Sequence, residues 1–200
     1  AATTIKYDRP LSKHKPRPKK HGKEYEWALL VSDAHGGETV NPEEALGIQY
    51  NWDICVRRIE EMRNQVLENL HDRGSSYRVR KLHVPIMGDM LSGEIHEELT
   101  ISNEFVIAEQ MSRMSHVLYN LLCDLSEHFD EIDAFVLPGN HPRTKKTPSY
   151  KQKFNNWEFA MGHMIKGMVE AAKIDNIKVD VPKSMIHVHQ IGRASCRERV

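Results

Sequence analysis

Three short apolar runs, separated by amphipathic segments, constrain the fold of this chain more than any other feature. The apolar runs span residues 27–31, 82–87 and 132–137. Apolar residues recur at helical spacing over residues 59–70, 104–128 and 154–168. Strand and helix therefore alternate along the chain, which predicts an α/β fold with largely parallel strands and helices on the faces of the sheet.

The individual runs predict further details of the sheet. The continuous apolar character of 27–31 favours a strand that is buried on both faces. Pro85 lies inside the second run, where a central strand would lack a hydrogen-bond donor, so we expect a bulge or an irregular strand there. Two more short strands are expected at 177–181 and 185–188.

A polar motif follows each of the three apolar runs directly. These motifs are Ser32-Asp33-Ala34-His35, Gly88-Asp89-Met90 and Gly139-Asn140-His141. The carboxyl ends of neighbouring parallel strands meet at one edge of a sheet, so the three motifs should converge. Each motif alone recurs by chance, but three in order after three strands predict one shared site.

The residue types in these motifs suit a pair of divalent metal ions. Phosphoester hydrolysis needs a hydroxide nucleophile and positive charge near the phosphate, and two ions about 3.5–4 Å apart supply both. Asp89 is the candidate bridging ligand, Asp33 and His35 would complete one ion, and Asn140 would bind the other. Such mixed ligands suit manganese, iron or zinc better than calcium. We expect manganese first, with iron, zinc or magnesium as alternatives.

These motifs resemble the first three blocks of the calcineurin-like metallophosphoesterase superfamily, from about Trp27 onward. The resemblance implies a sandwich of mixed β-sheets flanked by helices. It implies that Asp33, His35, Asp89 and Asn140 are metal ligands. It also implies that His141 is a catalytic residue that contacts the substrate phosphate or protonates the leaving group.

More narrowly, residues 32–38, 88–99 and 139–143 are similar to phosphoesterases carried by bacteriophages and prophages. Some relatives in the wider superfamily are DNA-repair nucleases, so the resemblance implies DNA or RNA as one candidate substrate. It also implies the cytoplasm of a bacterial host as the location. Pro142 stands at the position where many members carry an acid after Gly-Asn-His, so we expect no role that depends on that acid.

The family's later histidine blocks are not found, so we expect residues 24–190 to be a partial domain with little turnover. Ile191–Val200 resembles the translation of a sequencing adapter and is excluded from fold reasoning. His187-x-His189 has the spacing of the last block but lacks its preceding glycine and follows His141 too closely. We interpret it as part of a strand with two ordinary histidines.

Two further residues are candidates for substrate binding. His96 follows Asp89 closely enough to face the metal cleft, although an acid-rich helix start explains the neighbouring glutamates equally well. Arg143 could hold a phosphate beside His141. For Lys145 and Lys146 we favour an exposed polar loop.

Residues 1–23 are expected to form a basic, proline-containing linker. A basic arm can bind a polyanion, but a solvated connector is the favoured interpretation. The 40% hydrophobic and 28% charged content suits one soluble domain, and the net charge of zero favours no partner class. Cys55 and Cys123 fall in helical patterns and Cys196 lies in the adapter-like tail, so no disulfide is expected and a reducing compartment fits. No apolar stretch is long enough to span a membrane.

The leading hypothesis is hydrolysis of phosphoesters by metal-activated hydroxide. A phosphomonoesterase acting on a small molecule or a protein uses the same ligands and stays open as an alternative. A module that binds nucleic acid without cutting it is the third hypothesis.

Overall fold

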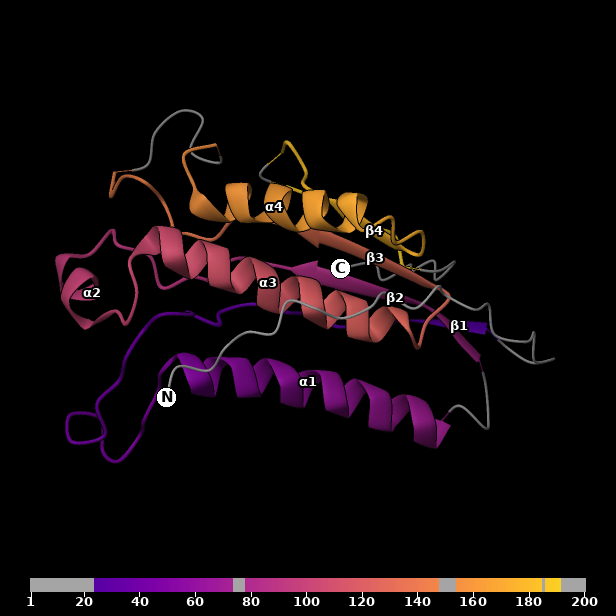
Figure 1. The fold of residues 1–200 in the computed structure, drawn as a ribbon, viewed down its shortest axis with the longest axis horizontal. Helices are drawn as coiled ribbons and strands as arrows, with labels where there is room; N and C mark the ends of the chain where they lie inside the picture. Colours follow the sequence, from indigo (N-terminus) through magenta and orange to yellow (C-terminus); the bar gives the residue numbers. More distant parts are fainter. Residues whose placement is uncertain (1–23, 74–77, 148–153, 185, 192–200) are drawn as a thin grey trace, which may run out of the picture.

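A four-stranded parallel sheet organises the part of the chain that the computed structural model describes, residues 24–73, 78–147, 154–184 and 186–191 (Figure 1). The elements are β1 (Glu24–Ala28), α1 (Trp52–Arg73), β2 (Arg78–Ile86), α2 (Glu97–Ser102), α3 (Ile107–Ser126), β3 (Glu131–Val136), α4 (Trp157–Ala171) and β4 (Ile177–Asp180). The strands lie in the order β1-β2-β3-β4, and every neighbouring pair is parallel. The predicted α/β class is confirmed. The described residues form one sheet rather than the two of a sandwich.

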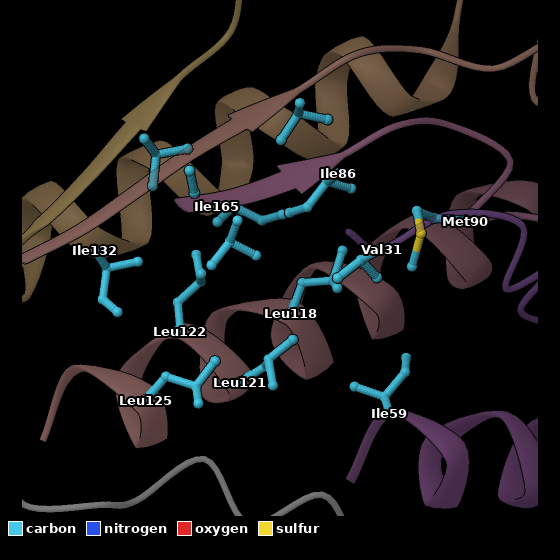
Figure 2. Close-up of a cluster of buried hydrophobic side chains, with 14 of the residues drawn as sticks. Val31, Ile59, Ile86, Met90, Leu118, Leu121, Leu122, Leu125, Ile132 and Ile165 are labelled. Atoms are coloured by element: carbon cyan, nitrogen blue, oxygen red, sulfur yellow. The ribbon is translucent and has the colours of Figure 1, made fainter. Parts of the chain in front are cut away.

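The hydrophobic core lies on one face of this sheet. Leu82, Ile132 and Ile177 stand side by side in register and belong to the core cluster. Residues of α1, α3 and α4 pack against them, among them Ile59 and Leu118 (Figure 2). The three long helices run side by side with α3 in the middle (Figure 1). In the described chain these three helices pack against the core side of the sheet, in line with the predicted helices on its faces.

The first strand differs from its prediction. β1 starts at Glu24, before the apolar run, and ends at Ala28. Leu30 is 61% exposed, and Val31 rejoins the sheet through a single bridge to Ile86. The expected burial on both faces is wrong for this strand, because each of its five residues is exposed or half-buried.

Pro85 is accommodated without a bulge at its own position. The register between β2 and β3 is regular through Pro85, and the carbonyl of Pro85 accepts a hydrogen bond from the Val31 N–H at 2.9 Å. The backbone nitrogen of Pro85 points to the same side of β2 as this carbonyl, toward residues that follow the end of β1 at Ala28. The absence of its N–H therefore removes no hydrogen bond from the regular pairing of β1 with β2. The irregularity lies instead between Tyr25 and Glu26 in β1.

The helices follow their apolar patterns closely. Asn51 caps α1, because its side-chain oxygen accepts the Ile54 N–H at 3.0 Å. Met114 and Leu118 of α3 are fully buried, as predicted for core residues. Cys55 in α1 and Cys123 in α3 form no disulfide within the described part of the chain. No described helix is both long and apolar enough to cross a membrane.

Of the two short strands predicted near the C-terminus, the first is confirmed and the second is not. β4 matches the first predicted strand, but residues 186–191 contain no strand. Val188 in this segment is 90% exposed, so its side chain gains no burial that would favour strand pairing. The predicted linker (1–23), most of the adapter-like tail (192–200) and Met185 lie outside the described residues.

Candidate functional site

The three polar motifs converge at the carboxyl ends of the strands, and backbone hydrogen bonds join them. The N–H of Asp33 donates to the Gly88 carbonyl at 3.1 Å, and the N–H of His35 donates to the Asp89 carbonyl at 2.9 Å. The Asp89 carboxylate accepts the backbone N–H of His141 at 2.8 Å. The second motif therefore lies between the other two and contacts both.

Three of the predicted ligands adopt a backbone conformation that side chains usually avoid. Asp33, His35 and Asp89 have φ angles of 54°, 45° and 50°. This left-handed region costs a residue with a Cβ about 1–2 kcal/mol. Strain of this kind persists where the surrounding structure enforces it, and it concentrates at functional sites. Here the hydrogen bonds between the loops supply that enforcement.

The histidines of the site lie close together. The ring of His141 meets that of His35 edge-on with 4.6 Å between ring centroids, and the ring of His96 lies 6.2 Å from His141. His141 Nδ1–H donates to the Ser92 carbonyl at 3.2 Å, which assigns a proton to Nδ1 and leaves Nε2 as the nitrogen that can exchange a proton. His35 Nδ1 is buried and has no hydrogen-bond partner among the described residues.

A buried carboxylate that the sequence analysis missed ties two of the loops together. Glu158, in the first turn of α4, is 0% exposed. Its Oε1 accepts the N–H groups of Met90 and Leu91, and its Oε2 accepts the Gly139 N–H at 2.6 Å. Asn156 caps the same helix and donates to the Gly139 carbonyl at 2.9 Å. The start of α4 therefore fixes the loops that carry Asp89 and Asn140.

Burial raises the pKa of Glu158 to about 7, and the charge of Asp89 adds to the effect. The hydrogen bonds from Gly139, Met90 and Leu91 lower this pKa, since they stabilise the ionised form, but they do not outweigh the loss of water. Two acidic groups thus lie near each other in a partly dry site, which favours a nearby cation.

The site brings together most of the predicted residues, with different degrees of exposure. Asp33 and Asn140 are exposed, while His35, Asp89 and His141 are half-buried. Arg143 Nε donates to the Asn140 backbone carbonyl at 2.7 Å, so Arg143 borders the same loop. His96 immediately precedes α2, which carries Glu97 and Glu98 in its first turn, in line with the acid-rich helix start. Lys145 and Lys146 are exposed.

The first motif also borders a pocket of about 460 Å³, which Asp33, Tyr50, Cys55 and Arg58 help to line. The Tyr50 hydroxyl donates to the Ala34 carbonyl, and the Arg58 guanidinium lies 5.1 Å from the centre of the Tyr50 ring. Burial raises the pKa of the Cys55 thiol, so this cysteine is a poor nucleophile at neutral pH. Arg58 is thus a cation beside the first motif.

Among the described residues, the one group of three His, Asp, Glu or Cys side chains close enough to share a metal ion lies elsewhere, and Asp33, His35 and Asp89 do not form such a group. His83, Asp133 and His189 offer ligand atoms that all lie within 4.8 Å of one another, and none of the three is a predicted ligand. The sequence analysis treated His189 as an ordinary strand histidine, and the strand part of that interpretation is wrong. His83 and Asp133 share a register position on neighbouring strands, which sequence spacing alone does not reveal.

Gly139 offers a direct test of how the loops fit together. A Cβ at Gly139 would lie 2.2 Å from Asp89 Oδ1 and 2.3 Å from the Asp89 backbone nitrogen. We expect Gly139→Ala to lower the free energy of unfolding by about 1–3 kcal/mol, because one of the two loops must move. Thermal denaturation measures this effect.

Gly167→Ala is the matched control for this substitution. A Cβ at Gly167, in α4, meets nothing within 4 Å. The control should raise stability by about 0.5–1 kcal/mol, since alanine favours a helix. Equal effects of the two substitutions would contradict the close approach of the loops.

The sequence was also compared with known proteins. No model of a known protein family matches it, and no curated protein matches it either. The assignment of function therefore depends on the residues and the geometry of the site itself.

Proposed function

We propose that this protein is a metal-dependent phosphoester hydrolase whose reaction takes place where the three loops converge. The observation that carries the proposal is the left-handed backbone at Asp33, His35 and Asp89, held in place by hydrogen bonds between their loops. Backbone strain at several chemically capable residues is typical of functional sites. A purely structural set of turns would favour glycine at such positions.

The residues present fit a pair of divalent ions. Asp33, His35, Asp89 and the side-chain carbonyl of Asn140 supply oxygen and nitrogen donors of the kind that manganese, iron and zinc accept. The buried and unpartnered His35 Nδ1 is a polar atom that lacks the partner a buried group normally has. When bound, the ions would supply a hydroxide at neutral pH and neutralise charge on the phosphate.

The side chains around the ligands would carry the remaining steps. His141, with its Nδ1–H held by the Ser92 carbonyl, presents Nε2 as the atom that holds a proton for the leaving oxygen. Arg58 lines the pocket beside Asp33, and Arg143 lies against the loop of Asn140, so both would bind phosphate oxygens. His96 would contact the substrate near His141.

The substrate class that we propose is a phosphodiester, with DNA or RNA as the candidate polymer. The open pocket beside Asp33 and the exposure of Asn140 favour a substrate that extends beyond the reacting phosphate. A small phosphomonoester is the alternative, because the same ligands serve both reactions.

Removal and return of the metal tests the proposal. Protein made from the full reading frame and stripped with EDTA should show no hydrolysis of bis(p-nitrophenyl) phosphate, and Mn²⁺ should restore the activity. The proposal predicts that an oligonucleotide is also cut, and faster turnover of p-nitrophenyl phosphate would favour the monoesterase. Nucleic-acid binding that survives EDTA, with no product in Mn²⁺, would instead support the non-catalytic module.

A further inference from the structure

The face of the sheet opposite the helices carries a second group of metal-ligating side chains. His83 on β2 and Asp133 on β3 are register partners, and His189 lies over them. His83 Nδ1 is 2.7 Å from His189 Nε2, and His189 Nε2 is 4.0 Å from Asp133 Oδ2. We propose that His83, Asp133 and His189 bind one transition-metal ion of the zinc type, at a site separate from the three loops.

Glu26 supplies the outer partner that such a site requires. Its carboxylate lies 2.8 Å from His83 Nε2, on the side of the ring away from His189. The carboxylate fixes the proton on Nε2, which leaves the lone pair of Nδ1 directed toward His189 and Asp133. Metal-binding histidines almost always donate their second N–H to a carboxylate or a carbonyl in this way.

The charges in contact at this site favour a cation. Asp133 Oδ2 lies 3.0 Å from Lys81 Nζ, and the same ammonium lies 2.7 Å from Glu131 Oε1. With Glu26, the contacting groups comprise three carboxylates and one ammonium. Lys81 is thus shared between two acids, and a net negative charge remains around His83 for a divalent ion.

His83 is buried, and His189 lies against an aromatic ring. His83 is 1% exposed, and the ring of buried Phe135 lies 4.4 Å from that of His187 and 4.9 Å from that of His189. Two independent contacts, the tilted ring contact with Phe135 and the approach to His83, therefore position His189.

The three ligand side chains indicate which metal the site would bind and what the metal would do for the fold. Two imidazoles and one carboxylate are typical of zinc sites with three protein ligands and one remaining position. Residues 186–191 form no strand or helix of their own. An ion bound by His189 and the two strand residues would fasten this segment across the polar face of the sheet.

Metal titration of matched variants tests this site. Wild-type protein should bind one equivalent of Zn²⁺ here by calorimetry, and Co²⁺ should give the visible absorption of a low-symmetry, histidine-containing site. His189→Ala and Asp133→Asn should each weaken binding by more than about a hundredfold, since loss of an outer partner alone costs about 10–100-fold. Glu26→Gln should fall within that 10–100-fold range.

Two controls separate this site from its surroundings and from the three loops. His187→Ala removes a ring that also contacts Phe135 but supplies no ligand atom, and it should retain the affinity. Asp89→Asn alters the loop site and should leave the Co²⁺ spectrum of this one unchanged. A wild-type protein that binds no Zn²⁺, or a His189→Ala variant with unchanged affinity and spectrum, would overturn the proposal.

Discussion

Replacement of Glu158 by alanine is expected to lower the free energy of unfolding by about 3–5 kcal/mol. The substitution leaves the N–H groups of Met90, Leu91 and Gly139 without their acceptor, and each buried unsatisfied donor costs about 1–3 kcal/mol. A loss of this size is a large part of the 5–15 kcal/mol that stabilises a typical domain. Urea denaturation at pH 6 measures it.

Glu170→Ala is the matched control for this substitution. Glu170 belongs to the same helix, and its side chain is 67% exposed. The control should change stability by less than about 0.5 kcal/mol. A comparable loss in both variants would contradict the role of Glu158 in holding the loops.

Glu158 also predicts a pH dependence. Its pKa rises from an ordinary 4.5 to about 7 on folding, so between these values the folded protein binds more protons than the unfolded chain. Stability from this group therefore falls as the pH rises through that window, by up to about 3 kcal/mol. Glu158→Gln cannot ionise. Wild-type stability should accordingly fall relative to Glu158→Gln between about pH 5 and pH 8, and a constant difference would contradict the raised pKa.

Asp89→Asn is expected to abolish Mn²⁺-dependent phosphodiester hydrolysis while the protein stays folded. The asparagine can still accept the backbone N–H of His141, which the wild-type carboxylate accepts at 2.8 Å. It cannot supply the negative charge that a bridging ligand provides. Loss of an outer partner costs about 10–100-fold, so loss of this ligand should reduce kcat/KM by more than about a hundredfold.

The folded state of Asp89→Asn provides the control for that experiment. In the metal-free protein the substitution should not lower the melting temperature, because it removes a charge that raises the pKa of Glu158. Asp72→Ala, at an exposed position of α1, should leave the activity unchanged. Full activity in Asp89→Asn would refute the assignment of Asp89 as a ligand.

Much of the fold follows from the sequence because local patterns decide it. The apolar runs and helical stripes identify β2, β3, β4, α1, α3 and α4, with shifts of a few residues at the ends. The polar face of the sheet also had a signal in the sequence. Residues 131–134 and 177–180 alternate between polar and apolar side chains, which is typical of a sheet with one polar face.

The site was predictable only in part, for a physical reason. A motif at the end of a strand is visible in the sequence, so the convergence of Asp33, Asp89 and Asn140 could be anticipated from parallel topology. The role of Glu158 in holding the loops could not be anticipated, because an acid in the first turn of a helix usually lies at the surface and complements the helix dipole. His189 depends on a long-range contact with His83 that no local pattern encodes.

The attachment of both loops to Glu158 affects how precisely the residues of the site are positioned. Asp89 and Asn140 belong to irregular segments, which usually vary in position more than helices do. Here both segments take their position from the first turn of one helix, whose own backbone is rigid. The distance between Asp89 and Asn140 is therefore held as constant as a distance within a helix, although neither residue belongs to a helix or a strand.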